Sequence, residues 1–552
     1  MRAIPFLLAM LLVGCGPSPD APSAAAPPQA EADRPHLFDT LGPFSRPGVS
    51  ADAMAQRWFD QGLILAYAFN HDAAGRAFAE AARLDPDCAL CIWGQALVLG
   101  PNINLPMLEE AFEPAYRLSQ QALAMADRAK PVERALIEAL ALRYAWPAPD
   151  DRTPLDRAYA EAMAQVVRNF PDDLDVATMY AEALMDLVPW AYWSREGEPS
   201  PYTADILATL ESVLARNPDH IGAIHYYIHA TEAGPQPEKA EVPADRLAAL
   251  SPGAGHLVHM PAHTYMRIGR YHDASLTNMK ATDADAAFMT YCRGSSGVYP
   301  MGYIPHNWHF LSMSAGLEGA SGIALRAAEH TAARTDRDML ADLHFMQQFL
   351  VTPLFAEVRF GQWDKVLARE TAQADLPFPR AIWHYARGRA LAAGGEADAA
   401  GRELLALEAI AADPEMATIM VSDLNNAASV LAVAEHSLRG MVLRADGDLQ
   451  GAAESLAEAA RLEDLLNYFE PPDWPLPNRH LLGAVLLEAG KPAEAEAVYR
   501  ADLRVFPKNG WSLYGLGLAL GAQDREDEAE VVWDAFAEAW AHADVKLASS
   551  HF

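Results

Sequence analysis

Residues 58–86 read WFDQGLILAYAFNHDAAGRAFAEAARLDP and contain two Ala-rich amphipathic stretches separated by a short turn. The alternation of apolar and polar residues that marks a β-strand is nearly absent here and along most of the chain. Gly62 and Ala74 are small enough to let two helices cross closely, whereas Phe78 can fill the interface with the next helix. Pro86 then stops the second helix. The stretch predicts a helical hairpin that stacks on another hairpin.

The same spacing of small and aromatic residues returns downstream, at Gly388, Ala400 and Leu404; at Gly440, Ala452, Leu456 and Ala459; at Gly483, Ala495 and Tyr499; and at Trp511, Tyr514, Gly515, Ala529 and Trp533. In this spacing the chain resembles the tetratricopeptide repeat (TPR) family, whose helix-turn-helix unit has about 34 residues. The resemblance implies an all-α fold, a TPR-type α-solenoid superhelix over residues 35–552. The pattern departs from the consensus at 103–215 and 283–303, where we expect insertions or degenerate repeats.

Seven of the 18 histidines lie in three short segments, IHYYIHATE (224–232), GHLVHMPAH (255–263) and PHNWHF (305–310). Spacings of three and four residues place such side chains on one face of a helix. The TPR resemblance implies that these faces belong to three successive units and line the concave groove. The predicted site spans about residues 218–315, and its candidate metal ligands are His225, His229, Glu232, His256, His259, His263, His306 and His309.

Imidazoles from neighbouring helices can meet at one ion, because packed helices lie about 8–10 Å apart and metal–nitrogen bonds measure about 2.1 Å. Imidazole ligation suits copper, zinc or iron, and Met313 near His309 favours copper slightly. Glu232 is the candidate base if the site is catalytic. Two other interpretations stay open: the histidines bind an anionic ligand or peptide terminus directly, or they are structural.

Three features near this site affect its geometry. Pro261 removes a backbone hydrogen bond and bends the helix that carries the second segment, unless that helix begins only after the proline. The aromatic run at 190–193 could cover the mouth of the groove. The segment 470–474, EPPDW, reads as a rigid connector before a repeat.

The N-terminus carries an apolar run that is too short to span a bilayer and ends in Leu12-Val13-Gly14-Cys15. This ending resembles a bacterial lipobox. The resemblance implies a lipoprotein signal peptide at residues 1–14, acylation of Cys15 and a lipid-anchored flexible stalk at 15–34, which is rich in Pro, Ala and Ser. We therefore expect a bacterial cell-envelope protein, anchored in the outer membrane and facing the periplasm. An ordinary signal peptide is the alternative.

Charge and cysteine content narrow the remaining possibilities. The formal net charge of −32 argues against nucleic acid as a partner, because phosphates would be repelled. Export would place the cysteines in an oxidising compartment, so Cys88 and Cys91 predict a local disulfide, with a metal–thiolate site and a redox pair as alternatives. No role is predicted for Cys292.

Together these features predict a membrane-anchored TPR lipoprotein that binds a transition metal through a His-rich concave groove. A metal-dependent periplasmic enzyme, redox or hydrolytic, on the same groove is the first alternative. The second is a metal-free scaffold with a protein or peptide ligand in the groove. The arrangement resembles large bacterial TPR proteins of unassigned chemistry, so the resemblance implies no reaction.

Overall fold

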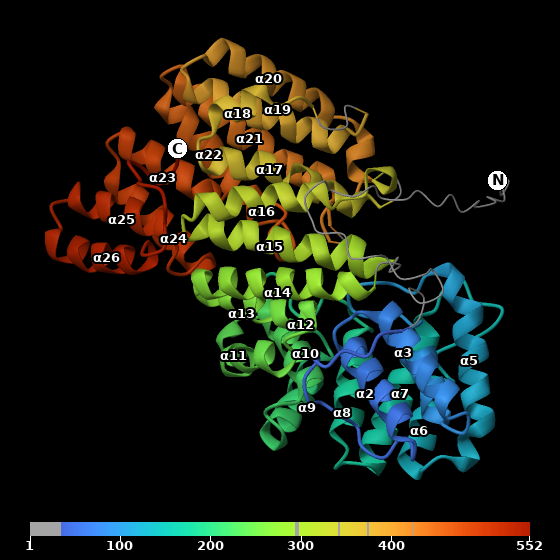
Figure 1. Cartoon of the computed structure of the whole chain (residues 1–552). Helices are drawn as coiled ribbons and strands as arrows, with labels where there is room; N and C mark the ends of the chain where they lie inside the picture. Colours follow the sequence, from blue (N-terminus) through green and yellow to red (C-terminus); the bar gives the residue numbers. More distant parts are fainter. Residues whose placement is uncertain (1–34, 293–296, 341–342, 372–374, 423) are drawn as a thin grey trace, which may run out of the picture. The chain divides into compact units, whose positions relative to one another are not determined.

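Antiparallel helical pairs follow one another along the chain (Figure 1). This computed structural model describes residues 35–292, 297–340, 343–371, 375–422 and 424–552. Over these residues no β-strand forms, and three isolated bridges are the only extended pairings.

The helices of the first part of the chain are α2 (Ala53–Tyr67), α3 (His71–Leu84), α4 (Ala89–Leu97), α5 (Phe112–Met125), α6 (Pro131–Leu140), α7 (Thr153–Asn169), α8 (Leu174–Met185) and α9 (Thr203–Arg216). The middle part contains α10 (Ile221–Glu232), α11 (Glu241–Leu250), α12 (Gly255–His259), α13 (Pro261–Ile268), α14 (Tyr271–Tyr291), α15 (Ile304–Leu317), α16 (Ser321–Ala333), α17 (Gln347–Arg359) and α18 (Trp363–Ala368). The last part contains α19 (Pro377–Ala393), α20 (Ala397–Ala411), α21 (Ala427–Ala445), α22 (Leu449–Glu463), α23 (Asn478–Glu488), α24 (Pro492–Val505), α25 (Gly510–Gly521) and α26 (Glu526–Ala539). A π-helical turn, η4, spans Tyr299–Tyr303, and short 3-10 helices lie at Glu109–Ala111, Ala126–Arg128, Pro237–Ala240, Arg337–Met339, His344–Met346 and Pro414–Ala417.

The hairpin predicted from the opening stretch is formed by α2 and α3. Helix α3 ends at Leu84, two residues before Pro86. Phe78 packs so closely on Gly62 that a Cβ atom at Gly62 would lie 2.7 Å from its ring. The same ring faces Gly94 of α4, where a Cβ atom would lie 2.6 Å away. Phe78 therefore joins the first hairpin to the next helix.

Later hairpins repeat this contact between a glycine and a large side chain. A Cβ atom at Gly440 in α21 would lie 2.5 Å from Leu456 in α22. Tyr499 of α24 lies directly against both Gly483 of α23 and Gly515 of α25. Each hairpin thus packs on its neighbour through close helix crossings, as in repeat proteins generally. The predicted fold class is confirmed: the described chain is all-α, a TPR-type α-solenoid.

The three histidine segments lie in successive units formed by α10 with α11, by α12 and α13 with α14, and by α15 with α16. Helix α12 ends at His259 and α13 begins at Pro261, with Met260 between them in helical conformation. Helical residues thus precede Pro261, while α13 begins at the proline itself, so the helical run is divided at this residue.

The C-terminal hairpins return to the middle of the chain. The indole N–H of Trp511 in α25 donates to the backbone oxygen of Gly316 in α15 at 3.0 Å. The hydroxyl of Tyr271 in α14 donates to the backbone oxygen of Pro507 at 2.9 Å. These bonds join segments 195 and 236 residues apart, so the last units support the unit that carries the histidines.

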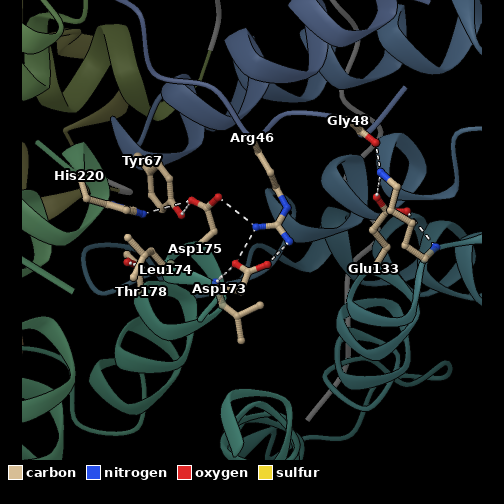
Figure 2. Close-up of polar contacts among 11 residues, drawn as sticks. Arg46, Gly48, Tyr67, Glu133, Asp173, Leu174, Asp175, Thr178 and His220 are labelled. Atoms are coloured by element: carbon tan, nitrogen blue, oxygen red, sulfur yellow. Dashed lines mark hydrogen bonds and ion pairs between the residues drawn. The ribbon is translucent and has the colours of Figure 1, made fainter. Parts of the chain in front are cut away.

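A buried polar network fixes the segment before α2 against α8 and the start of α10 (Figure 2). The guanidinium of Arg46 donates to Asp173 at 2.7 Å and to Asp175 at 3.0 Å. Asp175 also accepts a bond from the Tyr67 hydroxyl at 2.8 Å and lies 3.3 Å from Nε2 of His220. Tyr67 is the last residue of α2, so the network also fixes its backbone carbonyl, which bonds to a histidine of the site below.

The predicted signal peptide (1–14), Cys15 and the stalk (15–34) lie outside the described residues. Among the helices that are described, none combines the length and apolar character that a bilayer span requires. The lipid anchor therefore stays a prediction.

Candidate metal centre

Three successive units bring the predicted side chains into one buried place. Six of them are at most 2% exposed, namely His225, His229, Glu232, His256, His259 and His263. The histidines converge in two groups of three and not in one larger set, and within each group the candidate ligand atoms lie within 4.8 Å of one another. We call His225, His229 and His256 the first triad, and His259, His263 and His306 the second triad.

The first triad joins α10 to α12. Nδ1 of His225 donates to the backbone oxygen of Tyr67 at 2.6 Å, and Nδ1 of His229 donates to Oε1 of Glu232 at 2.6 Å. The Nε2 atoms of both rings are buried and have no partner among the described residues. Both ring nitrogens of His256 are buried without a partner as well. Buried polar atoms are rarely left unpaired, so this triad calls for a ligand.

The second triad joins α12 and α13 to α15. Nδ1 of His259 donates to Oδ1 of Asn278 at 2.6 Å, and the amide is oriented because its Nδ2 donates to Ala274 at 2.8 Å. Nδ1 of His263 donates to Oε2 of Glu232 at 2.5 Å. Nε2 of His259 lies 2.9 Å from Nε2 of His263 and 3.1 Å from Nε2 of His306. Three ring nitrogens therefore surround one point.

These contacts determine the tautomers. Where Nδ1 faces an oxygen acceptor it carries the proton, and Nε2 of the same ring carries the lone pair. The lone pairs of His259 and His263 thus face each other at 2.9 Å, which is repulsive unless a cation lies between them. A tetrahedral ion with bonds of about 2.1 Å separates its nitrogens by about 3.4 Å. The second triad is therefore close to the geometry of a metal site, and its outer N–H groups donate to oxygen as those of metal-bound histidines do.

Electrostatics also favour a cation. Burial, and then the neighbouring histidines, lower the pKa of four rings well below the usual value: His225, His256, His259 and His306. Burial opposes ionisation of Glu232, yet His263 and His229 hold the pKa of this carboxyl well below its usual range. Within the described chain, the Nδ1–H groups of these two histidines lie 2.6 Å and 2.5 Å from Glu232, so the neutral rings donate hydrogen bonds to the carboxylate. Unprotonated rings around one buried anion attract positive charge.

Glu232 lies behind the triads and not beside their free nitrogens. Each of its oxygens accepts a bond from one triad, and the Tyr468 hydroxyl donates to Oε2 at 3.3 Å. This is the position of a carboxylate that orients metal ligands. Glu232, which the sequence predicts as a ligand and as the candidate base, therefore contacts the outer nitrogens of the histidines.

His309 is the predicted ligand that the structure does not bring to either triad. Its ring lies 5.6 Å from that of Phe349, and it lines a water-sized cavity with Met313. His309 follows His306 by three residues, so its side chain leaves α15 in a direction about 60° away from that of His306. Burial lowers the pKa of His309 to about 3, which is typical of a neutral core histidine.

Aromatic side chains from distant segments enclose the triads. The ring of Phe69 lies 4.5 Å from His225 and 5.6 Å from His256, and that of Tyr303 lies 4.6 Å from His256. Trp190 lies 5.3 Å from His229, so one residue of the run at 190–193 does cover the site. Neither Phe69 nor Tyr303 could be found from histidine spacing, because Phe69 lies between α2 and α3 and Tyr303 ends η4, before the helix that carries His306.

The segment predicted as a rigid connector also reaches the centre. The Tyr468 hydroxyl lies 3.3 Å from Oε2 of Glu232 and 3.0 Å from Oε1 of Glu470, and it can donate its single proton to either carboxylate. Burial raises the pKa of the Glu470 carboxyl to about 7. In the sequence YFEPPDW (468–474), the only indication of this contact is that Tyr468 lies near two carboxylates, Glu470 and Asp473. Neither Tyr468 nor Glu470 is among the site residues predicted from the sequence.

A cavity of about 510 Å³ lies near the first triad, although no histidine of either triad is among its lining residues. Phe69 and Tyr303, which contact His256, form part of its wall, together with Tyr299, Asn102 and Leu105. Asp72 and Leu108, at another part of the wall, are exposed. Cavities of this size and mostly apolar lining are typical of small-molecule sites.

Cys88 and Cys91 form a disulfide at the start of α4. Its atoms are buried in the first hairpins, and neither residue belongs to the triads. Cys292, half-buried at the end of α14, is a free thiol.

No protein-family model matches the chain, and no curated protein matches it. Among solved structures, the human IFIT1 dimer with PPP-AAAA is 13% identical, with 86% of this chain and 88% of that chain covered and a TM-score of 0.30. Yeast Tom70 is 11% identical, with 88% and 93% covered and a TM-score of 0.26. The TPR domain of P58(IPK) is 13% identical, with 86% and 100% covered and a TM-score of 0.21.

Proposed function

We propose that this chain is a TPR-type lipoprotein that holds transition-metal ions in the two three-histidine triads. The observation that carries the proposal is the convergence of ring nitrogens whose protons are committed to oxygen acceptors on the far side of the ring. Neutral imidazole suits copper, zinc or iron. The donors that are present, three nitrogens at each triad, leave a fourth position open for water or another ligand.

The first experiment is element analysis of the protein that begins at Asp33, purified without a His tag and supplied with each metal. We expect at least one equivalent of copper, zinc or iron. The double variant His229→Ala with His259→Ala should lose the metal, because each substitution removes one ligand from one triad. His436→Ala, which changes a histidine outside the triads, is the matched control and should bind as much as the wild type. Equal binding by the wild type and the double variant would exclude the triads as metal sites.

The cellular location belongs to the same proposal and depends on Leu12 to Cys15. Acylation at Cys15 would tether the protein to a bacterial membrane, and the stalk would leave residues 35–552 in the periplasm. An exported protein meets metal ions outside the cytoplasm. The location and the metal proposal are independent, since either can fail alone.

A metal-dependent enzyme is the second candidate, and it is favoured by the cavity whose wall includes Phe69 and Tyr303, the two rings that contact His256. A small molecule in that cavity would lie one aromatic ring away from the first triad. The test is turnover of oxidisable and hydrolysable aromatic compounds by the metal-loaded protein. Activity should disappear in His256→Phe and fall in Leu105→Trp, which fills the cavity without touching a triad. Activity that Leu105→Trp leaves unchanged would exclude the cavity as the substrate site.

A further inference from the structure

The histidine rings of one triad lie as close to rings of the other triad as to rings of their own. Within the triads, ring centroids lie between 4.8 Å (His259 to His263) and 6.5 Å (His229 to His256). Across the boundary, His229 lies 5.5 Å from His263, and His256 lies 5.7 Å from His259. No layer of other side chains can fit between rings at these distances. Two ions bound by these triads would therefore be direct neighbours, with only the histidine rings around them.

Glu232 connects the triads chemically. One oxygen accepts the Nδ1 proton of His229 in the first triad, and the other accepts that of His263 in the second. A single buried carboxylate thus fixes the ligating tautomer in both triads and offers one negative charge to both ions. An ion in one triad polarises this carboxylate and changes the basicity of a ligand in the other.

From this arrangement we infer that the triads form one dinuclear centre, in which two copper, zinc or iron ions interact through space and through Glu232. The inference rests on the proposed function, because it needs both triads to bind metal. The dinuclear centre differs from two separate sites in that the six histidines hold a pair of interacting ions, three histidines to each ion, and Glu232 orients ligands of both. Two neighbouring ions, each with an open ligand position, could hold two atoms of one small molecule at the same time.

The charge of the ions predicts how their two binding affinities differ. Two divalent ions bring four positive charges to a buried site whose own anion is Glu232. Their repulsion in a medium of low dielectric makes the second ion bind more weakly than the first. Monovalent copper carries half that charge, so reduced copper should fill both triads with a smaller difference between its two affinities.

The experiment compares the full chain with two single-triad variants, His256→Phe and His306→Phe, after loading with Cu(II). Circular dichroism checks that each variant keeps its helices, and His309→Phe is the control outside the triads. Element analysis should give two equivalents for the wild type and the control, and one for each single-triad variant. Electron paramagnetic resonance should show isolated Cu(II) signals in the single-triad variants. The wild-type signal should be smaller than their sum, because neighbouring spins couple.

Each outcome decides the inference. Two equivalents with a reduced or broadened signal support the dinuclear centre. Two equivalents with a signal equal to the sum of the single-triad variants would show two independent sites, and the centre would be rejected. One equivalent in the wild type would also reject it while leaving the proposed metal binding intact. No metal in any protein would overturn both proposals together.

Discussion

Oε2 of Glu232 lies 2.5 Å from Nδ1 of His263, and the two residues are 31 positions apart on α10 and α13. This contact joins two successive units through a buried, charge-assisted hydrogen bond, which is stronger than a neutral one. It also turns the Nε2 lone pair of His263 towards the second triad. One side chain therefore serves the packing of the repeats and the chemistry of the histidines.

The first prediction concerns Glu232→Gln. The amide keeps one acceptor oxygen, so it can accept the Nδ1 proton of His229 or that of His263 but not both. The other ring must then place its proton on Nε2, where it cannot bind metal. We expect the variant to hold about one equivalent of metal where the wild type holds two, measured by element analysis. Two equivalents bound as tightly as in the wild type would show that the carboxylate does not fix the tautomers.

The second prediction concerns the close helix crossings. In Gly62→Ala, the new methyl group meets the Phe78 ring at 2.7 Å, and the free energy of unfolding should fall by about 1–3 kcal/mol. Gly401→Ala is the matched control, because Gly401 lies inside α20 with no atom within 4 Å of the added Cβ. Higher helix propensity should make that variant more stable by about 0.5–1 kcal/mol. Denaturant unfolding of the two variants should therefore give shifts of opposite sign.

The third prediction concerns pH and His309. Its folded pKa is about 3, below the ordinary value of about 6.5, so between these values the unfolded chain binds a proton that the folded chain does not. The contribution of neutral His309 to stability is complete above pH 6.5 and is lost as pH falls towards 3. Between pH 7 and pH 5, the free energy of unfolding of the metal-free wild type should fall by about 2 kcal/mol more than that of His309→Leu.

The measurement is denaturant unfolding of both metal-free proteins at the two pH values. The difference between the pH dependences is the quantity of interest, because the substitution also changes stability at pH 7. His309→Leu should retain all of the metal that the wild type binds, since His309 belongs to neither triad. Loss of metal in this variant would place His309 back among the ligands.

The fourth prediction concerns the membrane anchor. Cys15→Ser removes the thiol that acylation requires, so the protein should move from the detergent phase to the aqueous phase or accumulate as an uncleaved precursor. Phase partitioning of bacterial membranes followed by immunoblotting measures this. Wild type and variant in the same phase would exclude a lipid anchor at Cys15, with no consequence for the triads.

Helical periodicity and small residues sufficed to predict the repeats. Gly62, Gly440 and Gly483 all lie at close helix crossings, because only a small residue tolerates a large side chain at that position. Local spacing also placed His225 with His229 and His259 with His263, since residues three or four apart share a helix face. Such arguments work within one helix or between adjacent helices.

The division into two triads could not be predicted in this way. It depends on the relative rotation of four helices, α10, α12, α13 and α15, which residue spacing within one helix does not determine. The approach of Tyr468 to Glu232 spans 236 residues and depends on how the C-terminal units return to the middle of the chain. The contact of Asn278 with His259 could not be predicted either, because a single asparagine inside a helix gives no sequence signal of the histidine that it faces.

The distribution of ligands over α10, α12, α13 and α15 limits how this protein can vary among relatives. Arrays of helical hairpins commonly change in length during evolution by duplication or deletion of whole units, because each unit depends mainly on its neighbours. The unit of α12 to α14 supplies histidines to both triads, and each flanking unit completes one of them. Duplicating or deleting any of the three would disrupt a triad. We expect them to be inherited as one block, with insertions and deletions confined to hairpins before α10 and after α16.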